Sequence, residues 1–231
     1  MDNITPHSSE EYDEKVRKTI PYYENFQKET IDLIKTVKPE CKFWLDTGCG
    51  TGYLIELAIK IYSDCTFYLC DPSKEMTALA KNRLKMDHVE DTRNNKVVFN
   101  NFSTEKIPTS KMPKFDVITA IQAHHYLNKK GRVDATKKCF DTLKKNGVYI
   151  TFENIMPDSK RGIKIGLDRW MRFQIAQGKD KENVEQHLMR FNTKYFPITV
   201  KEHLDLLKDT DFVSYELFWL SHMQAGFFGV K

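Results

Sequence analysis

Asp46 and three glycines, Gly48, Gly50 and Gly52, form a D-x-G-x-G-x-G pattern within the stretch LDTGCGTGYL. The chain has only 10 glycines in 231 residues, so three in five positions indicate a special demand on the backbone. Glycine adopts positive φ angles easily and lets main chain approach a ligand closely. A helical pattern follows, and a helix start offers unpaired N–H groups. The stretch therefore predicts a ligand-binding turn between a strand and a helix.

The glycine spacing does not fit the dinucleotide fingerprint G-x-G-x-x-G. Counted from Gly48, the third glycine of that fingerprint falls on Tyr53, whose side chain would obstruct the close contact. A dehydrogenase is therefore disfavoured. A second acid, Asp71, follows the next apolar run, and its carboxylate can accept hydrogen bonds from two hydroxyls at once.

The spacing from Asp46 to Gly52, together with Asp71, resembles motif I of class I S-adenosylmethionine-dependent methyltransferases. The resemblance implies that Asp46 helps to hold the ammonium of S-adenosylmethionine and that Asp71 binds its ribose hydroxyls. S-adenosylhomocysteine would be the product. The neighbouring positions that the resemblance assigns to the cofactor are Thr47, Gly48, Cys49, Gly50, Gly52, Pro72 and Met76.

Two further segments match strand ends that flank the cofactor in this family. The segment VVFNNFSTEKIP places Asn101, Phe102 and Ser103 beside the adenine, although the aspartate usual there is absent. The segment TAIQAHHYL places Ile121 and Gln122 beside the methionine part.

A narrower likeness covers most of the chain. The segments RKTIPYYENF and ELFWLSHMQAGFFGVK resemble the carboxy-S-adenosylmethionine synthase branch, which implies that Tyr23 lies over the cofactor with Tyr22 beside it. That branch holds the extra carboxylate of its cofactor with an arginine, and Leu188 stands at the matching position here. We therefore expect ordinary S-adenosylmethionine, and Arg190 is a candidate for binding an anionic group of the substrate.

Three titratable residues are candidates for the chemical step. His124 and His125 follow the expected fourth strand, and histidine has the pKa of a base near neutrality. Glu153 ends the expected fifth strand and could bind or deprotonate an acceptor. The alternative is that one or both histidines only pack against the strand end and cap it. Methyl transfer needs a base only when the acceptor must lose a proton.

Aromatic side chains with a few cations predict a small, partly apolar acceptor that has a polar or negative group. The alternative for each of these residues, taken singly, is that it belongs to an amphipathic lid helix that only packs on the sheet. The candidate substrate-binding residues are Tyr22, Arg169, Trp170, Arg172, Phe173, Arg190, Trp219 and His222.

The elements that must position these residues alternate between strand and helix patterns, which predicts an α/β fold with a mostly parallel sheet. We expect one Rossmann-like methyltransferase domain over residues 1–231, with seven strands, helices on both faces and a C-terminal antiparallel hairpin. Residues 1–40 form helices over the site, and residues 156–198 form a helical lid insertion. A helix over 131–147 should stop at Asn146-Gly147, before a strand over 147–154. Thr199 and Glu202 have capping-box spacing.

Composition narrows the function classes. The net charge is only +4 with basic residues spread along the chain, so nucleic acid is not an expected partner. Five cysteines without CxxC spacing argue against a disulfide framework and a metal site. No apolar run reaches the roughly 20 residues of a membrane span. We expect a cytoplasmic protein, monomer or homodimer, acting on a small-molecule acceptor; a cofactor-modifying enzyme and a non-catalytic partner subunit remain the alternatives.

Overall fold

The computed structural model of the chain describes residues 11–86 and 96–231. Residues 1–10 of the predicted N-terminal helical segment lie outside this range. Two helices follow, α1 (Tyr12–Thr19) and α2 (Tyr23–Val37). Acids in the first turn of α1 and basic residues in its last turn suit the helix dipole. Tyr22 has a φ of 58° and makes the bend between the two helices.

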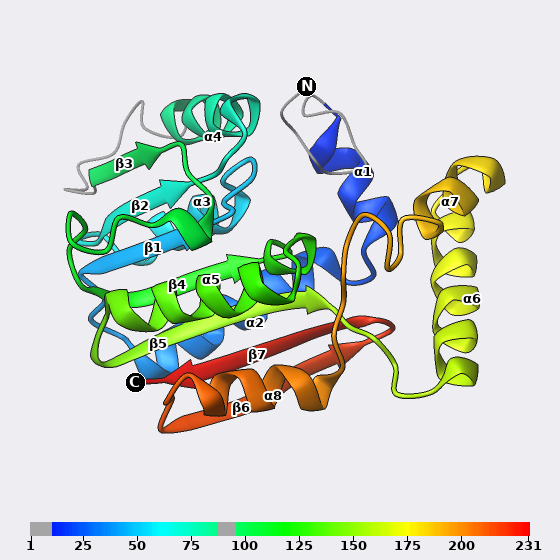
Figure 1. The fold of residues 1–231 in the computed structure, drawn as a ribbon. Helices are drawn as coiled ribbons and strands as arrows, with labels where there is room; N and C mark the ends of the chain where they lie inside the picture. Colours follow the sequence, from blue (N-terminus) through cyan, green and yellow to red (C-terminus); the bar gives the residue numbers. More distant parts are fainter. Residues whose placement is uncertain (1–10, 87–95) are drawn as a thin grey trace.

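The predicted α/β fold is confirmed. In the part of the chain that the structure describes, seven strands form one sheet in the order β3-β2-β1-β4-β5-β7-β6 (Figure 1). β1 to β5 are parallel, and β7 runs antiparallel to both β5 and β6. The strand bounds are β1 Phe43–Thr47, β2 Thr66–Cys70, β3 Lys96–Asn100, β4 Phe115–Ile121, β5 Leu143–Asn154, β6 Ser214–Ser221 and β7 Gln224–Val230.

The strand order reverses between β1 and β4, and this reversal fixes where a ligand can bind. In open parallel sheets, ligands occupy the crevice beyond the carboxyl ends of the strands at such a switch point. The glycine turn after β1 and the two histidines after β4 both lie at this place.

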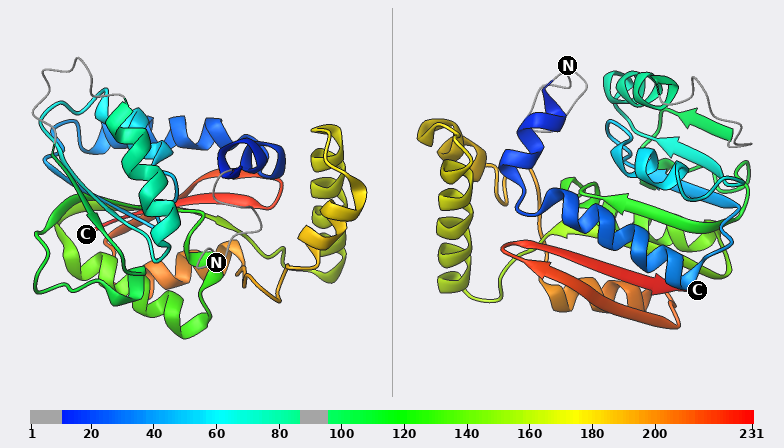
Figure 2. Two further views of the ribbon diagram at one scale, coloured as in Figure 1. Left: turned by 90° about the horizontal axis from the view of Figure 1, so that it is seen from above. Right: turned by 180° about the vertical axis from the view of Figure 1, so that it is seen from behind.

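Helices cover both faces of the sheet (Figure 2). On one face α2 packs on α3 (Tyr53–Ile59), and α3 packs on α4 (Lys74–Met86). On the other face α5 (Lys129–Thr142) contacts α8 (Val200–Asp209) and the short helix η1 (Thr104–Lys106). Buried apolar residues fill the space between the helices and the sheet on each face, with Trp44 and Phe67 in one cluster and Phe115 and Phe227 in the other.

The prediction that a helix continues to Asn146-Gly147 was wrong. α5 ends at Thr142, and β5 begins at once at Leu143. The pairing with β4 shifts register between Phe115 and Val117, and Asn146 has a φ of 59° within this irregular part of β5. The Asn-Gly pair therefore marks a distortion inside a strand, where the left-handed conformation is needed just as it is after a helix.

The C-terminal elements agree with the prediction. Thr199 and Glu202 form a reciprocal capping box at the start of α8, and β6 and β7 form an antiparallel hairpin. A main-chain turn through His222, whose φ is 51°, joins the two strands.

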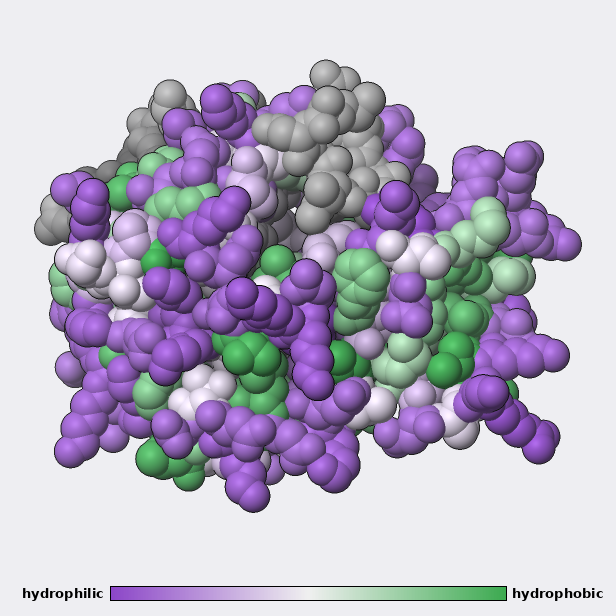
Figure 3. All heavy atoms as spheres, viewed as in Figure 1, coloured by the Kyte–Doolittle hydropathy of each residue, from purple (hydrophilic) through white to green (hydrophobic). Residues whose placement is uncertain are grey.

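Residues 156–198 contain two helices, α6 (Lys160–Ala176) and α7 (Lys181–Leu188). They stand beyond the carboxyl ends of β4 and β5, next to α1 (Figure 1). Figure 3 shows a largely hydrophilic surface over the sheet, with hydrophobic side chains gathered over α6. Together α1, α6 and α7 enclose the end of the sheet at which the candidate site residues lie.

Candidate active site

The glycine turn joins β1 to α3 in a conformation that suits glycine. Gly48, Gly50 and Gly52 have φ angles of 67°, 52° and 78°. The N–H groups of Gly48 and Cys49 donate to the carbonyl oxygen of Cys70 at 2.7 and 3.1 Å, which fixes the turn to the end of β2. A Cβ on Gly48 would meet the Cβ of Ala123 at 2.5 Å, whereas one on Gly50 would meet nothing within 4 Å. The main chain at Gly50 therefore faces open space.

Asp71 ties the turn to the start of α4. One carboxylate oxygen accepts from the N–H of Gly50 at 3.0 Å, and the other accepts from the N–H of Ser73 at 2.8 Å. The Ser73 hydroxyl in turn accepts from the Met76 N–H at 3.2 Å, so Ser73 caps α4 and Asp71 holds Ser73 in place. A carboxylate has about four lone-pair sites on its two oxygens, a number that suits the binding of a diol.

Asp46 is a buried carboxyl at the end of β1. Its Oδ1 accepts from the Thr119 hydroxyl at 2.6 Å, and that hydroxyl accepts from the Trp44 indole at 2.9 Å. Burial raises the pKa of Asp46 to about 7, against the opposite effect of the Thr119 hydrogen bond. A cation placed beside Asp46 would restore its ionised form.

A cavity of about 30 Å³ lies between the glycine turn, α1 and α2. We refer to it as the cofactor cavity. Tyr23 stacks on Tyr53 at its rim, with ring centroids 6.0 Å apart. Two amide atoms on its lining, Oε1 of Gln27 and Nε2 of Gln122, are buried and have no hydrogen-bond partner within the described residues. The lining residues are Tyr12, Tyr23, Gln27, Asp46, Gly48, Cys49, Gly50, Thr51, Tyr53, Leu54, Ile121 and Gln122.

These groups fit the amino-acid end of S-adenosylmethionine. A buried carboxylate suits its ammonium, unpartnered amide groups suit its polar atoms, and open space at Gly50 suits a ligand that approaches bare backbone. Space for roughly one water molecule remains in the cavity, so entry of a nucleoside requires movement of the helices that cover it.

Among the positions expected beside the adenine, Asn101 lies near the main chain of Asp71. The Asn101 side-chain amide donates to the Thr77 hydroxyl at 2.8 Å and lies 3.4 Å from the main-chain oxygen of Asp71. Ser103 lies next to Glu105, with the two side-chain oxygens 2.7 Å apart. Phe102 is half-buried against the core, Pro72 is exposed, Met76 is buried, and Thr47 is fully buried at the end of β1.

The two histidines have different surroundings. Both ring nitrogens of His124 are engaged, Nε2 with the Thr104 hydroxyl at 3.1 Å and Nδ1 with the Tyr149 hydroxyl at 3.0 Å. Burial lowers the pKa of His124 to about 4. A histidine that is fully bonded and hard to protonate is suited to holding the strand end in place.

His125 forms a pair with Glu153. The Nδ1 of His125 lies 2.8 Å from Oε2 of Glu153, and the N–H groups of His124 and His125 also donate to this carboxylate. Burial opposes ionisation of Glu153, but the hydrogen bond and charge of His125, with the neighbouring cations, lower its pKa to about 2. An ionised Glu153 keeps the proton of His125 on Nδ1, so Nε2 of the ring is left as the acceptor.

His125 lines a second cavity of about 30 Å³, which we call the acceptor cavity. Tyr12 and Gln122 line both this cavity and the cofactor cavity, so the two lie side by side. Residues from α1, the end of β5 and the lid complete it, and the sequence interpretation missed most of them because their positions share no spacing. The lining residues are Tyr12, Val16, Thr19, Ile20, Gln122, His125, Tyr126, Asn154, His187 and Tyr195.

The residues expected to bind substrate fall into separate groups. Tyr22 and Phe173 both lie near the His222 ring, at centroid distances of 6.3 and 5.8 Å. Trp170 is fully buried, and its indole donates to the Thr19 carbonyl at 2.6 Å. The structure places Trp219 in the same packed cluster, Arg169 and Arg172 on the exposed side of α6, and Arg190 in a separate cleft beside α1.

No helix of the described residues is at once long and apolar enough to cross a bilayer. Within the same residues, no three side chains among histidine, cysteine, aspartate and glutamate are grouped to hold a metal ion.

Comparisons with known proteins point in one direction. A family model described as a methyltransferase domain matches residues 45–149. The chain is 25% identical over 223 residues to the carboxy-S-adenosyl-L-methionine synthase of Nautilia profundicola, covering 95% of this chain and 90% of that protein.

Solved structures share the fold at low sequence identity. The plantazolicin methyltransferase BpumL, in complex with a desmethyl analogue and S-adenosylhomocysteine, superposes with a TM-score of 0.67 at 14% identity, covering 96% of this chain and 88% of that one. A structure from Nostoc punctiforme described as an O-methyltransferase gives a TM-score of 0.66 at 14% identity and 90% coverage of this chain. The chain spans 56% of that second protein's length.

Proposed function

Since the chain is an S-adenosylmethionine-dependent methyltransferase with the class I fold, we propose that it methylates a small molecule at an oxygen, nitrogen or sulfur atom. The observation that supports this proposal is the acceptor cavity next to the cofactor cavity, which is lined by residues of α1 and of the segment 156–198.

The chain's own residues would align the reactants. Bound S-adenosylmethionine supplies an electrophilic methyl group on a sulfonium. In the proposal Asp46 would hold the ammonium and Asp71 the ribose hydroxyls, and the neighbouring acceptor cavity would hold the acceptor. Alignment and exclusion of water account for most of the acceleration in such a displacement.

His125 is the proposed base. His125 lines the acceptor cavity, and Glu153 engages its Nδ1, so Nε2 is the ring nitrogen left for an acceptor. His125 would take the proton that the acceptor loses on methylation, and ionised Glu153 would stabilise the imidazolium so formed. His124 has no nitrogen available for this task, because Thr104 and Tyr149 occupy both.

A second candidate function is modification of the cofactor itself. Likeness over 95% of the chain to a carboxy-S-adenosyl-L-methionine synthase favours it. Leu188 stands where we expect the arginine of that branch, and it is buried, which favours the ordinary cofactor instead.

One experiment separates these functions. The protein is incubated with S-adenosylmethionine carrying a labelled methyl group and a low-molecular-weight cell extract, while released nucleosides are weighed by mass spectrometry. The proposal predicts label in a small product together with S-adenosylhomocysteine. A carboxylated nucleoside would support the second candidate, and label only in protein or nucleic acid would contradict the small-molecule proposal.

A further inference from the structure

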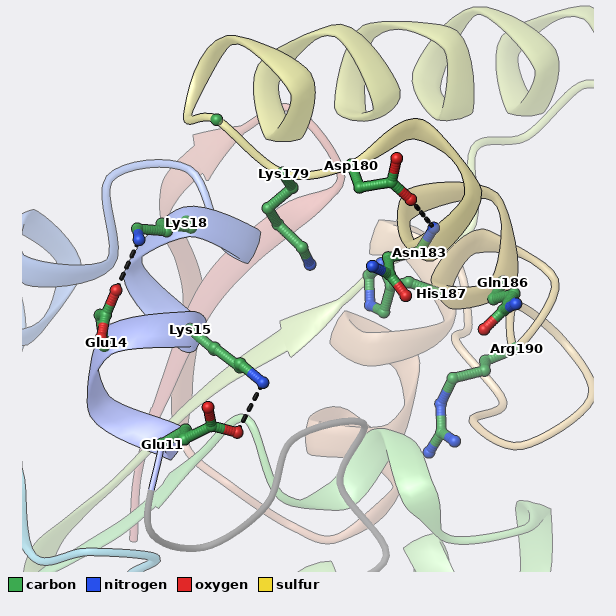
Figure 4. Close-up of a pocket in the computed structure, with 11 residues that line it drawn as sticks. Glu11, Glu14, Lys15, Lys18, Lys179, Asp180, Asn183, Gln186, His187 and Arg190 are labelled. Atoms are coloured by element: carbon green, nitrogen blue, oxygen red, sulfur yellow. Dashed lines mark hydrogen bonds and ion pairs between the residues drawn. The ribbon is translucent and has the colours of Figure 1, made fainter.

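A cleft of about 520 Å³ lies between α1 and the segment from Gly178 to Arg190, and neither proposed function uses it. Figure 4 shows charged side chains from both walls directed into this space, with Lys179 and Lys15 facing each other across it. We call it the cationic cleft. Its volume lies within the range of small-molecule sites.

The acids of the cationic cleft already have partners. Glu11 pairs with Lys15 and Glu14 pairs with Lys18, each at 2.6 Å and one helical turn apart. The third acid, Asp180, caps α7 by accepting from the Asn183 N–H at 3.1 Å.

Lys179 differs from the other cations of the cleft. Its ammonium donates to the Thr19 hydroxyl at 3.0 Å and to the Gln174 side-chain oxygen at 2.8 Å, and both acceptors are neutral. None of the ion pairs within residues 11–86 and 96–231 includes Lys179. An ammonium has three N–H donors, so one remains for a ligand. Burial, together with the charge of Lys15, lowers the pKa of Lys179 to about 8. A bound anion would favour the charged form of the ammonium and raise this pKa again.

Lys179 stands at the wall between the cationic cleft and the acceptor cavity. Thr19, which accepts from Lys179, lines the acceptor cavity, and His187 lines both spaces. Gln174 is fully buried between them: its oxygen accepts from Lys179, so its amide nitrogen faces Nδ1 of His187 at 3.1 Å. A molecule that spans from the acceptor cavity into the cleft would therefore pass this cation.

We infer that the acceptor carries an oxyanion, a carboxylate or a phosphate, which Lys179 holds while the group to be methylated lies at His125. This inference rests on the proposed function, since it extends the acceptor site of the same reaction. The substrate class is then a small molecule with a nucleophilic group at one end and a negative group at the other.

The alternative is that Lys179 only pins α1 to α6 through Thr19 and Gln174. The test must therefore remove the charge and keep the hydrogen bonds. Lys179→Gln removes the charge but can still donate to both acceptors. Lys179→Arg is the variant that keeps the charge. Lys18→Gln is the matched control, because Lys18 lies on the rim of the same cleft and is already paired with Glu14.

The first readout does not depend on turnover. Wild-type protein saturated with S-adenosylhomocysteine is treated with limiting acetic anhydride at pH 8, with or without benzoate or inorganic phosphate, and peptides are quantified by mass spectrometry. We expect one of the two anions to protect Lys179 at least fivefold more than Lys18, and the protecting anion identifies the carboxylate or phosphate class. Protection of Lys179 by neither anion, or equal protection of Lys179 and Lys18, would overturn the inference.

The second readout compares 4-hydroxybenzoate and phenyl phosphate with the neutral 4-hydroxybenzamide by calorimetry on the same complex. The protein should bind one of the anions about tenfold more tightly than the amide. Lys179→Gln should remove this difference, while Lys179→Arg and Lys18→Gln should keep it. An equal preference in Lys179→Gln and wild type would contradict the inference. Anion binding without methyl transfer to any small molecule would contradict only the proposed function.

Discussion

At the scale of single residues, the sequence specifies the cofactor side of the site better than the acceptor side. Asp46 and the glycines lie in and beside one turn at the end of β1, and Asp71 follows the next strand, so local patterns are enough to find them. The acceptor cavity draws Tyr12, His187 and Tyr195 from elements far apart in the chain, and only tertiary packing brings them together. No spacing in the sequence could therefore have predicted these residues.

His125 and His124 should respond differently to the same substitution. With an acceptor that must lose a proton, His125→Gln should lower kcat by about 10²- to 10⁴-fold, the usual worth of general acid–base catalysis. His124→Gln should mainly lower the melting temperature, because its two ring hydrogen bonds are buried. Steady-state kinetics across pH, with thermal unfolding of both variants, measures this. Equal kcat for His125→Gln and wild type would remove His125 as the base.

Asp46 should make cofactor affinity depend on pH. Burial raises its pKa to about 7, and the cofactor ammonium binds its ionised form, so binding below that pH must first remove a proton. Affinity for S-adenosylhomocysteine should fall by up to about tenfold for each pH unit below 7. Calorimetry from pH 5.5 to 8 measures the slope. Asp46→Asn should bind weakly with a flatter profile, and an identical slope in this variant would show that another group titrates.

At the scale of elements, α1 closes over the cofactor cavity and is held there by a polar contact. Asp13 on α1 accepts from the Thr51 hydroxyl at 2.7 Å beside the glycine turn and pairs with Arg83 of α4. The Arg83 guanidinium also lies 3.3 Å from Glu56 of α3. Because the cavity below has space for about one water molecule, α1 must move before a nucleoside can enter.

Weakening this contact should speed the exchange of the cofactor. A partly exposed ion pair is worth about 1 kcal/mol at most, so Asp13→Asn should release S-adenosylhomocysteine up to about fivefold faster. Stopped-flow displacement with excess S-adenosylmethionine measures the release rate. Glu14→Gln is the control, because the Glu14–Lys18 pair lies away from the glycine turn. Release at the same rate in Asp13→Asn, Glu14→Gln and wild type would show that α1 is not the gate.

The elements also show where local signals mislead. Asn146-Gly147 has the composition of a helix stop, yet it lies inside β5, because a strand distortion and a helix end both need a left-handed residue. Thr199 and Glu202 were a safer prediction, since two residues at fixed spacing must both satisfy backbone groups of one helix turn.

At the scale of the whole molecule, the sheet order confirms the predicted fold, while cytoplasmic location, a single domain and the oligomeric state stay predictions.

Buried titratable groups beneath the site link stability to pH. Burial lowers the pKa of His203 to about 3 and that of His124 to about 4, so the unfolded chain binds their protons first as pH falls. Stability should therefore decline below about pH 6.5, partly offset by Asp46, whose raised pKa acts in the opposite sense.

His203→Leu isolates one contribution to this decline. His203 is buried and stacks on Phe227, and it lies outside both cavities that the proposed function uses. Between about pH 6.5 and 4, the free energy of unfolding of the variant should fall less steeply than that of wild type, by up to about 1.4 kcal/mol per pH unit. Urea unfolding at a series of pH values measures both slopes. Parallel curves would mean that His203 titrates alike in the folded and unfolded chain.

The central claim is that the glycine turn and Asp71 form a working site for S-adenosylmethionine. Calorimetric titration of S-adenosylhomocysteine at pH 7.5 into wild type, Asp71→Ala and the surface control Asp64→Ala tests it most directly. The account predicts 1:1 binding to wild type and Asp64→Ala, and at least about tenfold weaker binding to Asp71→Ala, the worth of one charge-assisted hydrogen bond. No binding to wild type, or equal binding to Asp71→Ala, would contradict it.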